Sequence, residues 1–159
     1  AFAGLGRFKI DAKDIGHVLL GQAASLAPFA NHGGYGLLAG NQFLVVHAAQ
    51  QAADILATQD GVEAEIIDLR TLKPLDQAAL TATVAKTNRV VIVHEANLTG
   101  GIGGEISALL VEHAFEWLDA PIKRVAGLDT PTPYSPVLEE AFMPDAGKII
   151  AAVREVMHY

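Results

Sequence analysis

The sequence contains no cysteine among its 159 residues. This absence excludes disulfide bonds, thiolate metal sites and cysteine nucleophiles. Basic residues are scarce, since 11 Lys and Arg stand against 18 Asp and Glu, which gives a formal net charge of −7. So acidic a chain is a poor partner for nucleic acid or an anionic membrane surface, and no apolar run is long enough to span a bilayer. We therefore expect a protein that binds neither nucleic acid nor membranes.

The sequence also lacks the short motifs that identify common active sites. It has no G-x-S-x-G nucleophile turn and no His-x-x-His pair of the kind that binds zinc. Its glycine-rich run TGGIGGE fits neither the dinucleotide fingerprint G-x-G-x-x-G nor a Walker loop. We therefore assign no catalytic, cofactor-binding or metal-binding residue from the sequence.

What the chain does contain, between Arg89 and Trp117, is a buried strand, a glycine cluster and a helix. Val90–Val93 is a short, unbroken, β-branched run, which is typical of a strand covered on both faces, and His94 and Glu95 follow at its end. The glycine cluster and the apolar face of the helix after it comprise Gly100, Gly101, Gly103 and Gly104, and then Ile106, Leu109, Leu110, His113 and Trp117. This order of elements forms the unit of an α/β domain, in which ligands or partners collect at the loops.

The rest of the chain alternates strands and helices in the same way. The expected strands are Arg7–Ile10, Gly16–Leu20, Val62–Leu69, Arg89–His94 and Ile122–Ala126. The other expected helices are Gln42–Thr58, one capped by Asp76 and a last one started by Asp145. The alternation predicts one α/β domain over residues 1–159, with a largely parallel sheet covered on both sides. Two segments fit neither type, the long loop Ala23–Asn41 and the proline-rich, irregular excursion Leu128–Asp145.

Three features of the central stretch have both a structural and a functional interpretation. The glycine cluster allows close packing of the helix on the sheet or on another chain, or it binds an anion, although Glu105 in the first turn would repel a phosphate. His94 and Glu95 resemble an acid–base pair, but neighbours on a strand point to opposite faces, so we expect a structural pair hydrogen-bonded to loop backbone. His113 lies on the apolar stripe and is expected to be a core or interface histidine.

Three segments together resemble one protein family. They are EIIDLRTLKPLD (65–76), VVIVHEANLTGGIGGEI (90–106) and APIKRVAGLDTPTPYSPVLEEAFMPD (120–145). In order and spacing they are similar to the C-terminal domain of the β subunit of thiamine-diphosphate-dependent 2-oxo acid dehydrogenases. These are the decarboxylating components of pyruvate, branched-chain 2-oxo acid and acetoin dehydrogenase complexes, within the broader class of transketolase C-terminal domains. The resemblance implies a three-layer α/β/α sandwich with a mixed five-stranded, mostly parallel sheet whose first strand is antiparallel.

The resemblance also implies a role within a larger enzyme. The chain would be a fragment of a longer β subunit, in the cytoplasm or, in a eukaryote, the mitochondrial matrix. Thiamine diphosphate and Mg²⁺ would belong to the full complex and would not be bound by this inactive chain alone. Its partners would be the α subunit, a second β subunit and the subunit-binding domain of the dihydrolipoyl acyltransferase. The candidate subunit-interface residues are His94, Glu95, Gly100, Gly101, Gly103, His113 and Trp117, and the candidate docking residues are Glu116, Asp119 and Tyr159.

The match is weaker before His47, and alternatives stay open. VHAAQQAADIL resembles the first helix of the family and KIDAKDIGHVLLG its opening hairpin, but residues 22–44 form an atypical loop or insertion. One alternative is a stand-alone ligand-binding or regulatory α/β domain that holds an anion at TGGIGGE. Another is the C-terminal domain of a different transketolase-like enzyme, such as a deoxyxylulose-phosphate synthase, although the long segment APIKRVAGLDTPTPYSP argues against it. Whether the substrate is pyruvate or a branched-chain 2-oxo acid stays open.

Overall fold

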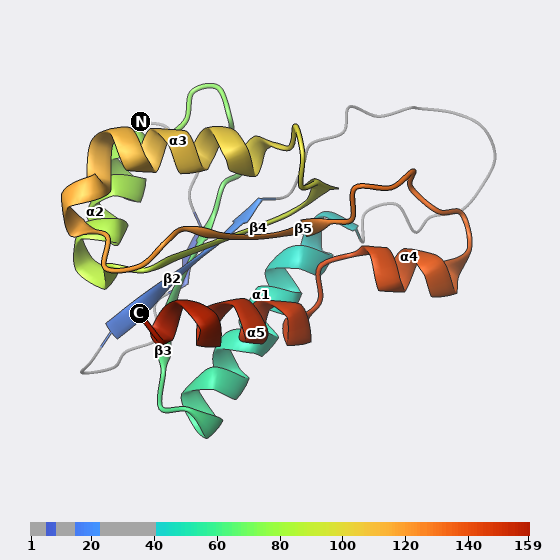
Figure 1. The fold of residues 1–159 in the computed structure, drawn as a ribbon, viewed down its shortest axis with the longest axis horizontal. Coiled ribbons are helices and arrows are strands. Elements are labelled where there is room, and N and C mark those ends of the chain that lie inside the picture. The colour runs from blue at the N-terminus through green and yellow to red at the C-terminus, as the bar shows by residue number, and fades with distance from the viewer. Residues whose placement is uncertain (1–5, 9–14, 23–40) are drawn as a thin grey trace.

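The computed structural model describes residues 6–8, 15–22 and 41–159 of the chain (Figure 1). The strands are β1 (Gly6–Phe8), β2 (Ile15–Gln22), β3 (Glu63–Asp68), β4 (Val90–Asn97) and β5 (Lys123–Gly127). The helices are α1 (Asn41–Gln59), α2 (Gln77–Thr87), α3 (Ile102–Ala114), the short 3₁₀ helix η1 (Phe115–Trp117), α4 (Pro136–Phe142) and α5 (Ala146–Met157). Within these ranges, none of the helices has both the length and the apolar character that crossing a membrane requires.

The five strands form one mixed sheet in the order β1-β3-β2-β4-β5. β2 runs parallel to both β3 and β4, and β4 runs parallel to β5. β1 is antiparallel to its neighbour β3. The predicted five-stranded, mostly parallel sheet with one antiparallel strand is therefore confirmed. The predicted opening hairpin is wrong, because β3 lies between β1 and β2 in the sheet.

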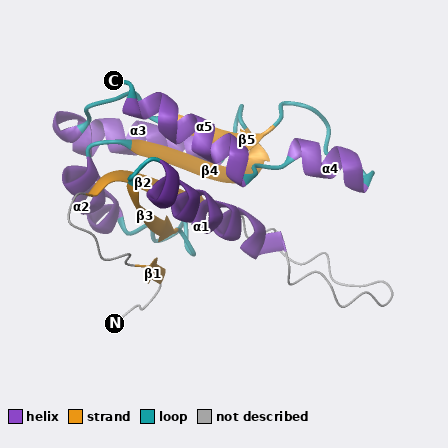
Figure 2. Cartoon of the chain, turned by 90° about the horizontal axis from the view of Figure 1, so that it is seen from below, coloured by secondary structure: helices purple, strands orange, loops and turns teal. Residues whose placement is uncertain are grey.

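Helices cover both faces of this sheet, as Figure 1 and Figure 2 show. On one face, α1 and α5 pack over a core that includes Ile66, Val93 and Val125. On the other face, α2 and α3 pack over a second core that includes Ile67 and Ile92. Successive residues of β3 and of β4 therefore point into different cores, as expected for strands buried on both faces. The predicted three-layer α/β/α sandwich is confirmed.

Capping carboxylates fix two of the predicted helix starts. The Ala79 N–H donates to Asp76 Oδ1 over 2.9 Å, and the Lys148 N–H donates to Asp145 Oδ1 over 2.8 Å. Each bond satisfies one of the backbone donors that the first turn of a helix leaves without a partner. The expectation that Asp76 and Asp145 begin helices is therefore confirmed.

The expectation that residues 128–145 are irregular throughout is wrong, because this segment contains α4. Ser135 is the N-cap residue and Pro136 lies in the first turn, where the missing N–H of proline loses no hydrogen bond. Phe142 at the other end is buried, and its ring lies against Gly127 at the end of β5. A serine followed by a proline is the sequence signal that indicates this helix.

The predicted insertion lies mostly outside the described residues. Gln22 belongs to β2 and residues 41–44 belong to α1, so the range 22–44 is too wide by these residues. Residues 23–40, and with them nearly all of the predicted loop Ala23–Asn41, lie outside the part of the chain that the structure describes.

Candidate functional site

The glycine turn that begins α3 encloses the imidazole of His94 at the carboxyl end of β4. His94 is fully buried. A Cβ on Gly101 would lie 2.5 Å from His94 Cε1, and a Cβ on Gly103 would lie 2.5 Å from His94 Nε2. A Cβ on Gly101 would also collide with the carbonyl oxygen of Asn97. Glycine at these two positions therefore lets α3 pack directly on β4, which favours the structural interpretation of the glycine cluster.

His94 has no hydrogen-bond partner on either ring nitrogen. The expectation that it is hydrogen-bonded to loop backbone is therefore wrong. Burial is the main cause that lowers the pKa of His94 below its ordinary value, and the positive charge of Arg124 lowers this pKa further. The backbone of Ala96 acts in the opposite direction, but it is too poorly placed to form a hydrogen bond. The imidazole is therefore neutral in the folded chain at neutral pH.

Glu95 occupies an irregular part of β4, where the pairing with β5 changes register between His94 and Asn97. Its side chain is partly buried, and Oε1 is buried without a hydrogen-bond partner. Burial raises the pKa of the Glu95 carboxyl above its ordinary value. Because both nitrogens of His94 are unpartnered, the two residues are not hydrogen-bonded as an acid–base pair.

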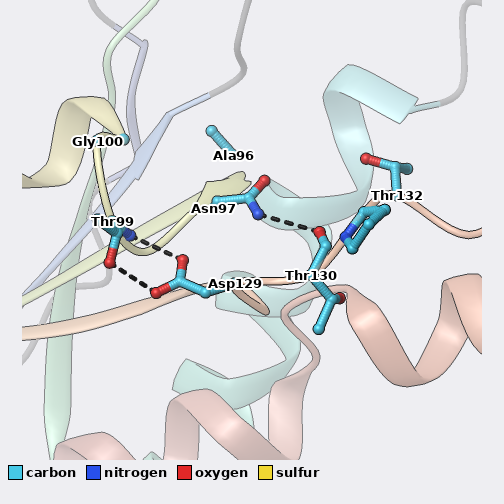
Figure 3. Close-up of a pocket in the computed structure, with 9 residues that line it drawn as sticks. Ala96, Asn97, Thr99, Gly100, Asp129, Thr130 and Thr132 are labelled. Atoms are coloured by element: carbon cyan, nitrogen blue, oxygen red, sulfur yellow. Dashed lines mark hydrogen bonds between the residues drawn. The ribbon is translucent and has the colours of Figure 1, made fainter.

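An open groove of about 800 Å³ lies beside the glycine turn, at the carboxyl ends of β4 and β5. Its walls come from the end of β4 and from the loops that follow β4 and β5, and they comprise Ala96, Asn97, Thr99, Gly100, Gly101, Asp129, Thr130, Pro131 and Thr132. Figure 3 shows Thr99 turned toward Asp129, and Asn97 turned toward Thr130. Ligands of parallel sheets bind at this edge, so the groove is the position at which the fold itself favours a site.

Hydrogen bonds join the two loops that form the groove. Thr99 donates to Asp129 through its N–H over 2.9 Å and through its hydroxyl over 2.6 Å. Asn97 Nδ2 donates to the carbonyl oxygens of Leu128 over 2.9 Å and of Thr130 over 3.1 Å. The bonds from Thr99 lower the pKa of the Asp129 carboxyl, which is therefore ionised at neutral pH. A fixed negative charge here would repel a phosphate, which argues against an anion site at the glycine turn.

The apolar face of α3 differs from the predicted one at its C-terminal end. Ile106, Leu110 and Ala114 are buried, whereas His113 is exposed. The expectation of a core histidine is therefore wrong, because Ala114 takes that place, and only the interface interpretation of His113 is left. His113 and Trp117 line a shallow groove of about 520 Å³ with residues of α2, which are Gln77, Ala78, Thr81, Ala82 and Ala85.

A second apolar surface of α3 meets the end of the chain. Phe115 is 70% exposed and Tyr159 is 67% exposed. Both line a groove of about 560 Å³, here called the C-terminal groove, together with Ser107, Val111, Leu118, Asp119, Ala120, Pro121 and Ile122. The structure thus brings together two of the predicted docking residues, Asp119 and Tyr159, while the exposed Glu116 does not line the groove. Sequence reasoning missed Val111 of α3 and Phe115, the first residue of η1, whose four-residue spacing in the sequence indicates a second apolar stripe.

Two hydrogen bonds to and from Asn88 hold Asp119 in place at the edge of the C-terminal groove. Its N–H donates to the Asn88 carbonyl over 2.8 Å, and Asn88 Nδ2 donates to the Trp117 carbonyl over 2.8 Å. The Asp119 carboxylate lies 4.0 Å from Arg89 Nη1, and the Asp119 side chain is 61% exposed. So long and exposed an ion pair contributes little to stability, so the carboxylate can exchange it for a partner's cation.

The predicted subunit-interface residues differ in their access to a partner. His94 and Gly103 are buried inside the chain, so they can shape a contact surface but cannot reach a partner directly. Gly100 and His113 are exposed, while the remaining members of the set are partly buried, namely Glu95, Gly101 and Trp117. Among the described residues, no three His, Cys, Asp or Glu side chains form a cluster that could hold a metal ion.

The buried His94 makes stability depend on pH. In the unfolded chain the imidazole binds a proton near its ordinary pKa of 6.5, whereas the folded chain resists protonation. The unfolded state therefore gains protons below that pH, and stability falls by at most about 1.4 kcal/mol per pH unit from this group. Urea unfolding of the wild type and of His94→Gln between pH 7.5 and 5 measures the difference in slope.

Glu95 acts in the opposite sense in that titration. Because the pKa of Glu95 is raised in the folded chain, the folded chain holds this proton more tightly than the unfolded chain. The stabilisation that Glu95 contributes is therefore lost as pH rises above the ordinary value of 4.5. Comparison with His94→Gln separates the two groups, because only the imidazole contribution disappears. Equal slopes for the wild type and the variant would show that His94 is protonated equally in both states.

A family model described as "Transketolase, C-terminal domain" matches residues 44–149. The chain is 46% identical over 112 residues to the mitochondrial pyruvate dehydrogenase E1 component subunit beta of Dictyostelium discoideum, covering 70% of this chain and 31% of that protein. It is 48% identical over 113 residues to the 2-oxoisovalerate dehydrogenase subunit beta of Pseudomonas aeruginosa, covering 71% and 31%. The acetoin:2,6-dichlorophenolindophenol oxidoreductase subunit beta of Bacillus subtilis is 43% identical over 112 residues, which cover 70% and 32%.

The chain thus spans about a third of the length of the curated relatives it matches. Among solved structures, it resembles a protein described as "Split gene transketolase, inactive beta4 tetramer", with a TM-score of 0.66 and 20% identity over 92% of this chain and 39% of that one. That likeness shows the fold alone. The family model covers two thirds of the chain and includes all of β3, β4 and β5, so the resemblance predicted from the three motifs is confirmed. This chain belongs to the family of transketolase C-terminal domains.

Proposed function

We propose that the chain is the C-terminal domain of the β subunit of a 2-oxo acid dehydrogenase decarboxylating component. In this role it helps to assemble the subunits and docks the dihydrolipoyl acyltransferase, while the assembly oxidatively decarboxylates pyruvate or a branched-chain 2-oxo acid. The relatives named for pyruvate, 2-oxoisovalerate and acetoin support this role. They include mitochondrial and bacterial proteins, which supports the mitochondrial matrix or the bacterial cytoplasm as the compartment.

The C-terminal groove is the observation that carries the docking proposal. It combines an apolar floor, the exposed rings of Phe115 and Tyr159, and the weakly paired carboxylate of Asp119. Aromatic anchors beside an available charge are the composition of an interaction hot spot. The net charge of −7 suits a basic partner such as the subunit-binding domain, because opposite charges speed encounter and fix orientation.

Deleting Tyr159, or changing Asp119 to alanine, should weaken binding of the acyltransferase subunit-binding domain by about 2–5 kcal/mol each. Loss of the Asp119 carboxylate would leave a basic group of the partner partly buried without its counter-charge, and loss of Tyr159 would remove an aromatic anchor of the groove. A contact confined to the rim would lose only about 0–1 kcal/mol. Calorimetric titration of the chain with the isolated subunit-binding domain, at two salt concentrations, separates these ranges.

Asp54→Ala is the matched control for that titration. Asp54 is an exposed carboxylate on α1 and takes part in none of the ion pairs of the described residues, so its removal should change binding by less than about 0.5 kcal/mol. In a complete β subunit carrying this chain, decarboxylation with an artificial electron acceptor should persist in both docking variants. Loss of decarboxylation with unchanged docking would refute the role of this groove.

The groove between α2 and α3 is the surface that we assign to a neighbouring subunit. Its α2 wall consists of short side chains, among them Ala78, Ala82 and Ala85, which allow another chain to approach closely. His113 and Trp117 from the predicted interface set form the opposite wall. In the proposed assembly this surface faces the second β subunit, and the α subunit completes the heterotetramer.

Thiamine diphosphate and Mg²⁺ would belong to the complete assembly, because the described residues do not fit them. Glu105 in the first turn of α3 and the ionised Asp129 would both repel a diphosphate at the glycine turn. The chain alone should therefore show no saturable binding of thiamine diphosphate in the presence of Mg²⁺ and no decarboxylation of 2-oxo acids. Calorimetry with the cofactor, and with inorganic phosphate, checks this. Micromolar binding of either ligand would favour the alternative of a stand-alone ligand-binding domain.

A further inference from the structure

The helix α4 exposes an apolar side that covers none of the domain's own core. Val137 is 75% exposed and Leu138 is 59% exposed, and the ring of Tyr134 just before the helix is fully exposed. Val137 and Leu138 are adjacent residues in the first turn of α4, and Tyr134 lies in the bend that leads into it. Figure 1 shows α4 projecting beyond the end of the sandwich, next to the first turns of α1. Grouped apolar side chains on the surface of a soluble domain mark contact sites.

Beside this exposed side lies a groove between α4 and α1, here called the α4 groove. It holds about 450 Å³ and is lined by His47, Ala48, Gln51, Pro136, Glu139, Glu140, Met143, Pro144, Asp145 and Ala146. The apolar members are short or unbranched side chains, which leave room for one apolar side chain of a partner. Its carboxylates belong to Glu139 and Glu140 of α4 and to Asp145, the N-cap residue of α5.

Two of these carboxylates are uncompensated. Asp145 caps α5 and lies 3.2 Å from Lys148 Nζ, so its charge is already paired. Lys148 Nζ also donates to the carbonyl oxygens of Ala141 and Met143, which commits this cation to the end of α4. Within the described residues, neither Glu139 nor Glu140 takes part in a side-chain hydrogen bond or an ion pair. Among the described residues, the α4 groove therefore places apolar side chains beside two carboxylates that have no ion-pair partner.

The helix that forms this wall is held in place from within the chain. Phe142 is buried against Gly127, and Lys148 binds the carbonyl oxygens at the end of α4. The surface is therefore formed before any partner arrives, so little conformational entropy is lost on binding. A helix that is fixed in this way and turns apolar side chains outward is suited to binding a partner.

We propose that the α4 groove and the exposed side of α4 dock a basic segment of another polypeptide. An apolar side chain of that segment enters the groove, and its Lys or Arg side chains face Glu139 and Glu140. A second copy of this chain is the poorer occupant, because the same two carboxylates would face a chain whose net charge is −7. This surface lies on α1 and α4 and shares no residue with the C-terminal groove, so the inference stands apart from the proposed docking of the acyltransferase.

The test uses the whole chain and a synthetic peptide of alternating Lys and Leu as the probe. Amide chemical shifts, recorded during titration at low salt, should change at residues of the α4 groove. The double variant Glu139→Gln with Glu140→Gln should weaken binding about tenfold, as expected for the loss of two exposed charge pairs. The matched control, Glu105→Gln with Glu112→Gln, makes the same change in net charge on α3 and should weaken binding less than about twofold.

Each other outcome overturns the proposal. Equal binding of a Glu/Leu peptide would show that apolar contact alone is recognised. An equal loss in the control variant would show only general attraction to an acidic protein. Shifts of the same amides with protein concentration, in the absence of peptide, would identify a second copy as the occupant. Shifts confined to the C-terminal groove would place the basic partner there alone.

Discussion

Replacing Gly101 by alanine should lower the free energy of unfolding by about 3 kcal/mol, and replacing Gly103 by about 1–3 kcal/mol. In both variants the new Cβ would lie within 2.5 Å of the buried His94 ring. At Gly101 it would also meet the carbonyl oxygen of Asn97, which belongs to the backbone of β4 and cannot turn away. The loss is therefore larger at Gly101. Urea unfolding followed by circular dichroism measures both values.

A shorter side chain at position 94 distinguishes the two collisions. His94→Ser removes the ring that blocks Gly103, so Gly103→Ala combined with His94→Ser should be more stable than the sum of the single losses predicts, by about 1 kcal/mol. The same combination with Gly101→Ala should recover much less, because the Asn97 carbonyl stays in place. Simple additivity at Gly103 would contradict the contact with His94.

Gly104→Ala is the matched control in the same turn. A Cβ there would lie 3.5 Å from Arg124 Nη1, which is an ordinary contact, and Gly104 is inside the helix α3. Alanine is favoured over glycine in a helix by about 1 kcal/mol, so this variant should be as stable as the wild type or more stable. A loss similar to that at Gly103 would mean that the glycines serve the loop's conformation and not its packing on His94.

The layers of the fold could be predicted because burial on both faces leaves a mark in the sequence. Val90–Val93 is apolar at every position, and the structure places alternate residues of this run in the two cores. Asp76 and Asp145 are short carboxylates ahead of apolar repeats, and each caps a helix. At these positions the local preference of the residues agrees with their tertiary packing, so the sequence pattern alone is sufficient to predict the strand and the two helix starts.

The candidate site could be predicted only in part, because its geometry depends on contacts across the chain. The spacing of Gly101 and Gly103 indicates close approach, but not that the approaching group is an imidazole without a hydrogen bond. His113 and Ala114 are neighbours in the last turn of α3, and a small rotation about the helix axis decides which of the two is buried. The apolar repeat does not fix that rotation here, because α3 ends and η1 begins at Phe115. The C-terminal groove is formed by residues between 107 and 122 together with Tyr159, and the sequence around either segment does not indicate that the two lie side by side.

The helix α4 could not be predicted from apolar periodicity, because only one of its large apolar side chains is turned to the core. A helix with one buried position has no apolar repeat that the sequence could reveal. Phe142 is that position, and replacing it by alanine should release α4 from the domain. Removing a buried phenylalanine costs about 3–5 kcal/mol, and here most of the loss should fall on the local opening of α4.

Native-state hydrogen exchange can locate that loss. The amides of Glu139 and Met143, which donate to the carbonyl oxygens of Ser135 and Glu139, should lose about hundredfold or more in protection in Phe142→Ala. Amides in the middle of α5 should keep theirs, because α5 packs on α1 in a separate core. The control, Val137→Ala, shortens an exposed side chain of the same helix and should change exchange by less than about threefold. Equal acceleration in α4 and α5 would show instead that Phe142 belongs to the cooperative core, and that α4 cannot open without unfolding the sandwich.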